Sequence, residues 1–403
     1  MSRLATDRTG FPATTTAPYA PRVQARVVAI ALALLLPGAA ALAGPYGWRH
    51  AALFLVGGAL GLVLYHAAFG FTAAFRAFAS VGDTRGLRAQ MLMLAVATVL
   101  FAPMLSVGTV FGTEVAGAVA PAGVGVLLGA AVFAIGMQLA GGCGSGCLFN
   151  LGGGATSMIV ALVGFAAGSI VATLHADLWR GLPSLGPISL GDALGWLPAV
   201  ALQLAAFGVI ALVAKRWERR RLGDVRPVAP PVRGWRRLLH GPWSLAGGAI
   251  ALAALNAVVV VLSGHAWGIT WGITLAGAKA LRALGVDVAA IDFWSDGFPA
   301  DALAASVFAD ETAMMDAAIV LGALLGAGLA GRFHVGRVTV RRGAIALAGG
   351  LLLGYGARLA FGCNIGAYFS GIASTSLHGW LWLAGALLGT PIGVLLRRRA
   401  GLD

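Results

Sequence analysis

The sequence predicts an all-α polytopic membrane protein made of two inverted-topology repeats, with broken or re-entrant helices around a central site. Hydrophobic residues make up 59% of the chain and charged residues 11%, and the mean hydropathy is +0.87. Soluble domains carry about 25% charged residues. The apolar residues gather in long runs that suit about ten full spans. A cysteine-containing motif also occurs once in each half of the chain.

A span is expected wherever about 20 mostly apolar residues follow one another. The predicted spans are 27–45, 50–75, 89–106, 122–141, 156–175, 193–214, 244–263, 313–331, 343–360 and 378–396. The stretch 266–282 is also apolar, but it follows the span 244–263 too closely to be a separate crossing. We therefore predict a re-entrant or broken helix there.

The distribution of charge orients these spans. Lys and Arg gather in the segments 76–88, 215–237, 332–342 and 397–399. None lies between Arg282 and Arg332, where seven acidic residues from Asp287 to Asp316 are assigned to an outside loop. Basic loops stay in the cytoplasm, so ten spans place both termini on the cytoplasmic side of a bacterial inner membrane. The same clustering accounts for the net charge of +13, and nucleic-acid binding is not expected.

Spans and charges together divide the chain into six segments. We expect a disordered basic cytoplasmic tail, a first span, a first repeat, a cytoplasmic basic linker, a second repeat and a basic cytoplasmic tail at 1–26, 27–45, 46–214, 215–242, 243–396 and 397–403. The segment 27–45 resembles a signal peptide, because small residues follow its apolar run. The long polar segment before it and the spans after it favour an uncleaved span.

The duplicated motif reads GMQLAGGCGSGCLF at 136–149 and GARLAFGCNIGAYF at 356–369. Seven of its fourteen positions are identical, and all three cysteines of the chain lie in these two stretches. The span before Cys143 is predicted to run inward and the span before Cys363 outward, as an inverted repeat requires. A second echo pairs HAAFGFT at 66–72 with HAWGIT at 265–270.

The glycines of each motif predict a break in a membrane helix, because each costs a helix interior about 1 kcal/mol. Helix N-termini at such breaks expose N–H groups that attract anions. A neutral thiol in an apolar site can contact a soft sulfur atom of a ligand. The candidate substrate-binding residues are Cys143, Cys363, Gly142, Gly144, Ser145, Gly146, Cys147, Gly362, Asn364, Gly366, Arg358 and Gln138.

A structural role is the alternative for these candidates. The glycines could serve close helix packing, and Cys147 could be a small buried apolar residue, since the second copy has Ala367 there. Arg358 could extend to the membrane interface. A zinc site is not supported, because no His/Cys pair has a familiar spacing, and three residues separate Cys143 from Cys147, one more than a redox Cys-x-x-Cys has. No metal and no cofactor is expected.

On these residues the chain resembles the YeeE/YedE family of sulfur-transport membrane proteins. The likeness is specific at the two cysteine motifs and at SLHGWLW, residues 376–382, and covers about residues 50–396. It implies an hourglass-shaped inner-membrane permease that relays thiosulfate or a related sulfur anion by hydrogen bonds to thiols. Cys143 and Cys363 match two of the family's central cysteines, whereas Gly70 stands where its thiosulfate carriers have a third. Some relatives act with a small cytoplasmic sulfur-carrier protein, which the basic linker could dock.

The predicted function is therefore transport of thiosulfate or a related sulfur-containing anion, and the chain is not expected to be an enzyme. It lacks a Gly-x4-Gly-Lys-Ser/Thr nucleotide motif, so a gradient drives uptake or the protein is a facilitator. One alternative is a membrane sulfurtransferase in which Cys143 or Cys363 forms a persulfide. That reaction needs a thiolate beside a cation such as Arg358. Another alternative is a subunit that binds a protein partner and transports nothing.

Overall fold

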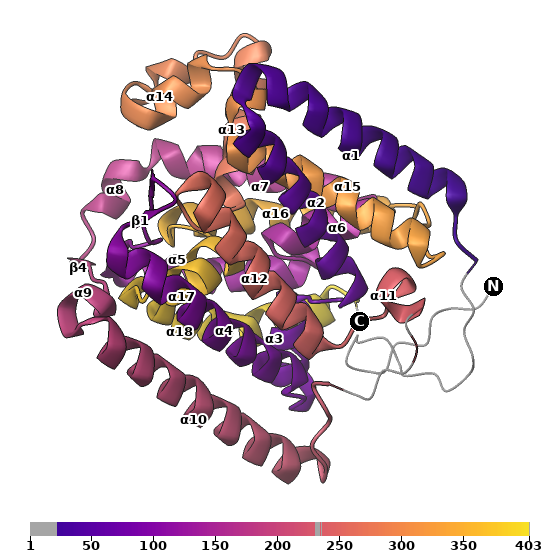
Figure 1. Ribbon diagram of the computed structural model, residues 1–403, viewed down its shortest axis with the longest axis vertical. Coiled ribbons are helices and arrows are strands. Elements are labelled where there is room, and N and C mark those ends of the chain that lie inside the picture. Colours follow the sequence, from indigo (N-terminus) through magenta and orange to yellow (C-terminus); the bar gives the residue numbers. More distant parts are fainter. Residues whose placement is uncertain (1–21, 230–233, 235, 403) are drawn as a thin grey trace.

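The computed structural model describes residues 22–229, 234 and 236–402, which form a helical bundle (Figure 1). The helices are α1 (Ala25–Tyr46), α2 (Trp48–His66), α3 (Phe71–Val81), α4 (Arg85–Val107), α5 (Val124–Ala140), α6 (Gly144–Gly152), α7 (Ser157–Leu174), α8 (Ala176–Arg180), α9 (Leu190–Leu194), α10 (Trp196–Leu222), α11 (Arg236–His240), α12 (Leu245–Ser263), α13 (Thr270–Ala283), α14 (Gly297–Ala304), α15 (Glu311–Leu329), α16 (Val340–Leu359), α17 (Gly371–Ala373) and α18 (Leu377–Arg399). Three 3-10 segments, η1 (Val288–Ala290), η2 (Asp292–Trp294) and η3 (Val307–Ala309), and a π-helical segment, η4 (Asn364–Ser370), complete them.

Two small antiparallel pairs of strands connect helices at one end of the bundle. They are β1 (Thr109–Val110) with β2 (Thr113–Glu114), and β3 (Pro121–Gly123) with β4 (Ser184–Pro187). Most of the predicted N-terminal tail, residues 1–21, lies outside the described residues.

Among the described residues, ten helical stretches are long and apolar enough to cross a membrane, which confirms the predicted number. Each begins within four residues of a predicted span. The predicted span 50–75 is interrupted, because α2 ends at His66 and Ala68 takes a positive φ of 46° before α3 begins at Phe71. The predicted spans 122–141 and 343–360 continue into second short helices, so the two stretches end at Gly152 and Ala373.

The apolar stretch 266–282 forms α13, which has 14 residues. At 1.5 Å per residue its length is about 21 Å, too short to cross a hydrocarbon core of about 30 Å. It follows α12 across a short loop, as α3 follows α2. Each half of the chain thus contains a long helix followed by a short one, at the position of the HAAFGFT and HAWGIT echo.

The helices of the two halves pack on each other rather than within separate domains. Helix α2 packs on α15 and α12 on α4, while α7 packs on α16 and α18 on α5. Glycine allows these close approaches: a Cβ at Gly322 would overlap the carbonyl oxygen of Gly58, and one at Gly354 that of Phe165. Helices of the first half thus pack against helices of the second half, as expected for two repeats of one structural unit. The inverted twofold relation between the halves, and the segment boundaries above, stay predictions.

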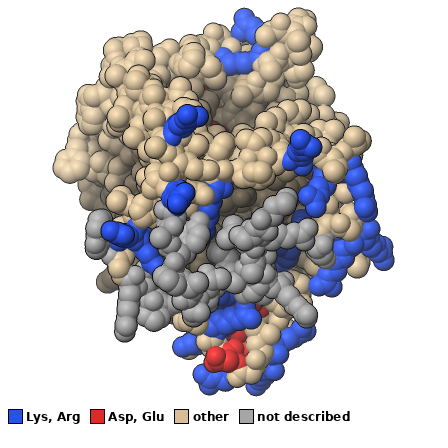
Figure 2. All heavy atoms as spheres, turned by 90° about the vertical axis from the view of Figure 1, so that its right-hand side faces the viewer, with Lys and Arg blue, Asp and Glu red and all other residues tan. Residues whose placement is uncertain are grey.

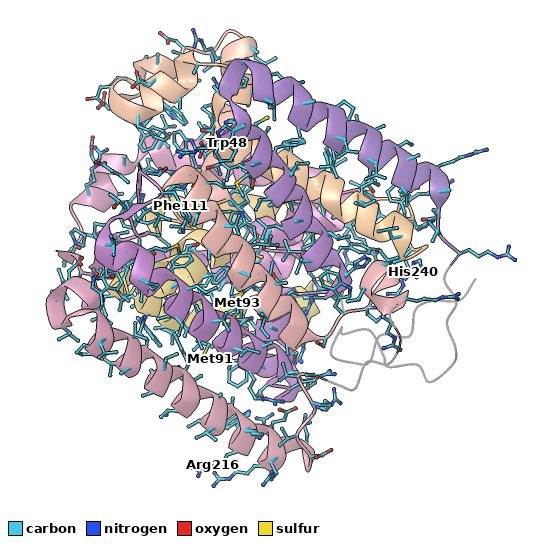
Figure 3. All side chains as sticks on the ribbon, viewed as in Figure 1. Trp48, Met91, Met93, Phe111, Arg216 and His240 are labelled. Carbon is cyan, nitrogen blue, oxygen red and sulfur yellow. The ribbon has the colours of Figure 1, made fainter. Side chains whose placement is uncertain are left out.

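The two ends of the bundle differ in charge. Figure 2 shows one end, where Lys and Arg clearly outnumber Asp and Glu. Arg216 and His240 lie toward this end in Figure 3, whereas Trp48 and Phe111, which are 67% and 89% exposed, lie toward the other end with α8 and α14. The basic end is the one that the sequence assigns to the cytoplasm.

Buried ion pairs fasten the linker to this basic end. The Glu218 carboxylate, which is buried at the end of α10, accepts hydrogen bonds from Thr84 Oγ1 (2.6 Å) and Arg88 Nη2 (2.8 Å). The buried Asp83 carboxylate pairs with Arg85 and Arg226. These contacts hold α4, α10 and the start of the linker together, and removing one partner would leave a buried charge uncompensated.

Candidate functional site

The two copies of the motif are built in the same way. Each cysteine directly precedes a short helix, with backbone angles φ −83°, ψ −167° at Cys143 before α6 and φ −102°, ψ −164° at Cys363 before η4. The preceding helices end at residues with positive φ, namely Gly141 (86°) in the first copy and Phe361 (56°) and Gly362 (146°) in the second. The predicted break is therefore present in both copies, and each break brings a helix N-terminus next to a thiol.

The three thiols lie close together in the interior. A Cβ placed on Gly144 would be 3.4 Å from Cys363 Sγ, and one on Gly146 would be 3.4 Å from Cys143 Sγ. A Cβ on Gly142 would be 3.4 Å from Cys147 Sγ. All three cysteines are free and at most 1% exposed. The absence of side chains at these glycines lets the two motifs pack closely around the sulfur atoms.

Each paired thiol contacts a group two residues further along. Cys143 Sγ lies 3.4 Å from Ser145 Oγ, and Cys363 Sγ accepts a hydrogen bond of 3.4 Å from the backbone N–H of Ile365. The sulfur of Cys363 thus occupies the N-cap position of η4. Helix N-termini carry a partial positive charge, so both thiols lie where an anion would be stabilised.

Asn364 is buried beside Cys363 without satisfying its hydrogen bonds. Its side chain is 0% exposed, and neither Oδ1 nor Nδ2 has a hydrogen-bond partner within the described part of the chain. A buried amide left without partners costs about 1–3 kcal/mol. A ligand between the two breaks would satisfy it.

A cavity of about 760 Å³ reaches the second break from the end of the bundle opposite the basic face. Gly362, Gly366 and Arg358 line it, together with Gly268 and Ile269 before α13. The guanidinium carbon of Arg358 lies 4.8 Å from the centre of the Phe293 ring. Within the described residues this guanidinium makes no ion pair or hydrogen bond, so it is available to an anion.

Ile269 separates this cavity from the first break. Its Cγ2 atom would be 3.2 Å from a Cβ on Gly144, and the side chain is 1% exposed. None of the predicted site residues of the first copy lines the cavity, and Cys363 and Asn364 of the second copy do not line it either. The two copies are adjacent, but only Arg358, Gly362 and Gly366 of the predicted site face the cavity.

Gln138 lies away from the cavity, near the first break. Its Nε2 donates a 3.4 Å hydrogen bond to the carbonyl oxygen of Thr72, while its Oε1 and the hydroxyl of Thr72 have no partner among the described residues. Thr72 belongs to α3, the short helix that follows the break in α2. Sequence reasoning could not place Thr72 beside the motif, because the contact joins residues that are 66 positions apart.

Two further buried polar groups next to the motifs are absent from the predicted site. Gln90 on α4 accepts a 3.2 Å hydrogen bond from the hydroxyl of Tyr368 on η4. Asp316, which lies within the predicted span 313–331, is the sixth residue of α15 and only 6% exposed. Because α15 begins at Glu311, the acid lies more than one helical turn inside the span. An acid inside an apolar helix was the available signal.

His265 pairs with an acid at the cavity end of the bundle. Its Nε2 lies 3.3 Å from a carboxylate oxygen of Glu311, at the start of α15. The hydrogen bond to Glu311 raises the pKa of His265 above its ordinary value, against the opposing effect of burial. This pair links the loop after α12 to α15, next to the entry of the cavity at Gly268.

Ten apolar spans around paired helix breaks, with thiols and an unsatisfied amide at their centre, define a multi-pass membrane protein of the transporter class. Residues 66–392 match the family model described as "Sulphur transport". The chain therefore belongs to the sulphur transport family, in agreement with the YeeE/YedE resemblance of its motifs.

Relatives in this family are named as transporters. The thiosulfate transporter TsuA of Spirochaeta thermophila is 27% identical over 373 residues, which cover 85% of this chain and 98% of that protein. The probable transporter YedE of Salmonella typhimurium is 29% identical over 161 residues, covering 38% of this chain and 37% of that protein. YedE of Escherichia coli is 28% identical over 173 residues, or 40% of each chain.

Proposed function

We propose that this protein carries thiosulfate, or a closely related sulfur-containing anion, across the bacterial inner membrane. One observation carries the proposal: Cys363 directly follows Gly362, which lines the cavity, and directly precedes Asn364, whose buried amide has no hydrogen-bond partner among the described residues. Thiosulfate has anionic oxygens and a soft terminal sulfur. Amide and backbone N–H groups suit the oxygens, and thiols suit the sulfur.

The anion enters from the cavity end, which the charge pattern assigns to the periplasm. Arg358 draws it toward the second break, because a cation in a cleft with apolar walls raises the local concentration of anions. Asn364 and the N–H groups at the start of η4 take its oxygens, and Cys363 contacts its sulfur. Movement of Ile269 then opens the way to Cys143 and the first break. Each contact is weak, as conduction requires.

Transport without covalent chemistry fits the surroundings of the thiols better than sulfur transfer does. A persulfide reaction needs a thiolate, which an adjacent cation would have to stabilise. Among the described residues, no Lys, Arg or His side chain hydrogen-bonds to Cys143, Cys147 or Cys363. We therefore propose that the protein is not an enzyme. On the separate ground of the basic loops, we propose that both termini lie in the cytoplasm.

The basic linker provides the surface for the proposed cytoplasmic partner. Residues 215–242 are rich in arginine, and their described part, 215–229, 234 and 236–242, lies at the end of the bundle shown in Figure 2. A small sulfur-carrier protein with an acidic surface would be attracted to this end and could receive the anion there. Co-purification that is lost at high salt supports this partner, and co-purification unaffected by salt contradicts it.

Uptake of labelled thiosulfate by cells without other importers tests the function. We expect uptake with the wild type, and at least a tenfold loss in Cys363→Ala and Cys143→Ala. The control variant is Thr390→Ala, which removes a buried hydroxyl that bonds only to its own helix at Ala386. Full uptake by both cysteine variants would refute the thiol pathway, and no uptake by a folded wild type would refute the substrate.

A further inference from the structure

Asp316 is an ionisable residue inside the membrane-spanning part of α15, and its carboxylate makes no contact within the described part of the chain that would explain a structural role. It is 6% exposed, and both of its carboxylate oxygens lack a hydrogen-bond partner among the described residues. Acids in such positions are expensive, and in membrane proteins they mark ion pathways and proton relays. Structural buried acids elsewhere in this chain are paired, as Asp83 and Glu218 are.

The carboxyl group lies against the start of α13, next to residues that line the cavity. A Cβ on Gly272, the third residue of α13, would be 2.7 Å from Asp316 Oδ2, so the acid rests against the backbone of this short helix. Residues 268–271, directly before Gly272, line the cavity. Asp316 is also close enough to Cys363 to interact with it electrostatically. The first turn of α13 therefore adjoins both the cavity and the acid.

The other half of the chain has a neutral, satisfied group at the matching helix position. Gln90 is the sixth residue of α4, as Asp316 is of α15, and the two helices exchange packing partners between the halves. Gln90 is paired with Tyr368, whereas Asp316 is unpaired. Helix packing at this position is thus compatible with a neutral amide, which leaves the charge of Asp316 unexplained by structure.

Few ionisable groups surround the carboxyl. Asp310, at the start of the same helix, interacts with it electrostatically, as Cys363 does. The other ionisable residues on α15 and on the helices packed against it are Glu311 on α15, Tyr46 on α1, His50, Tyr65 and His66 on α2, Cys147 on α6, His240 on α11 and Lys279 on α13, together with arginines in first or last turns. No described basic residue forms an ion pair with Asp316. With no such counter-charge, the protonation of Asp316 can depend on whether an anion is bound beside Cys363.

We propose that Asp316 is a proton-binding site that couples anion uptake to the proton gradient; this inference rests on the proposed function. The carboxylate takes up a proton from the cavity when the anion reaches Cys363, and releases it toward the cytoplasm when the anion leaves. At a membrane potential of about 100 mV, negative inside, a dianion that crosses alone is about two-thousandfold less concentrated inside the cell than outside at equilibrium. Each accompanying proton reduces this difference roughly fiftyfold.

The test uses the purified full chain in liposomes that contain a pH-sensitive dye, with labelled thiosulfate as the probe. For the wild type we expect thiosulfate entry to acidify the interior, and an acidic outside to raise accumulation at least about fivefold. Asp316→Asn should exchange labelled for unlabelled thiosulfate at a rate within about twofold of the wild type. It should not acidify the interior, and an acidic outside should not raise its accumulation of thiosulfate. Asp316→Glu should restore both proton effects in part, and Asp287→Asn, which changes an exposed loop acid, should behave as wild type.

The outcomes separate the two proposals. If the wild type exchanges no thiosulfate, the proposed function fails and the coupling fails with it. If the wild type exchanges thiosulfate without proton movement, or if Asp316→Asn keeps both proton effects, only the coupling is overturned. Should the Asn and Glu variants be monodisperse and yet both lose exchange, Asp316 belongs to the anion path instead, which also overturns it.

Discussion

A single methyl group at Gly144 should obstruct the passage between the two breaks. A Cβ there would lie 3.2 Å from Ile269 Cγ2 and 3.4 Å from Cys363 Sγ, at or inside the optimal contact distance of about 3.5–4.0 Å. It would press against Ile269, the side chain that separates the cavity from the first break. Transport through this passage requires that the anion, which is larger than a methyl group, displace these side chains.

The effect of Gly144→Ala on stability should be small. Residue 144 is the first residue of α6, and alanine favours a helix over glycine by up to about 1 kcal/mol. Overpacking against Ile269 and Cys363 costs about 1–3 kcal/mol. The net change is a loss of about 0–2 kcal/mol, which leaves a folded protein in which thiosulfate uptake should fall at least tenfold.

Uptake and thermal unfolding in detergent, measured on the same preparation, check this prediction. The matched control is Gly208→Ala on α10, where a Cβ would meet no atom within 4 Å. That variant should unfold at the same temperature or higher and transport as wild type does. A folded Gly144→Ala protein with unchanged uptake would show that the anion does not pass between the breaks.

Three further results are expected. Asn364→Leu should abolish uptake without lowering the unfolding temperature, because it removes a buried amide without partners; a large loss of stability would show that the amide is structural. Arg358→Gln should raise the KM for uptake about tenfold with little change in maximal rate; an unchanged KM would exclude Arg358 from anion capture. The pair of His265 with Glu311 raises the folded pKa of His265 above its ordinary value, so its stabilising effect is present at acidic pH and is lost as pH rises from about 6.5 through the raised pKa; His265→Gln should flatten this dependence in thermal unfolding, and an unchanged profile would contradict it.

The spans and the breaks at the cysteines were predictable because their signals are local. Runs of about 20 apolar residues mark the spans, and the glycines around Cys143 and Cys363 mark the breaks. The break between His66 and Phe71 has a weaker signal, since only Gly70 departs from helix-forming residues there. The echo with residues 265–270 was its clearest sign, because α13 begins at that place in the second half.

The burial of Asp316 and the shape of the cavity could not be read from the sequence. An acid at the start of an apolar run can lie at the interface or be buried, and the outcome here depends on Gly272 across the helix contact. The cavity likewise joins segments from residue 121 to residue 366. The roles of the predicted site residues are still a hypothesis, although the structure brings the motifs of both halves together.

A structure determined with thiosulfate bound would show directly whether the anion binds at the cysteine motifs. We expect the anion between the two breaks, with its terminal sulfur within about 4 Å of Cys363 Sγ and an oxygen within about 3 Å of the Asn364 amide. An anion bound elsewhere in the protein, with the Asn364 amide and both thiols untouched in every state that transports, would contradict this expectation.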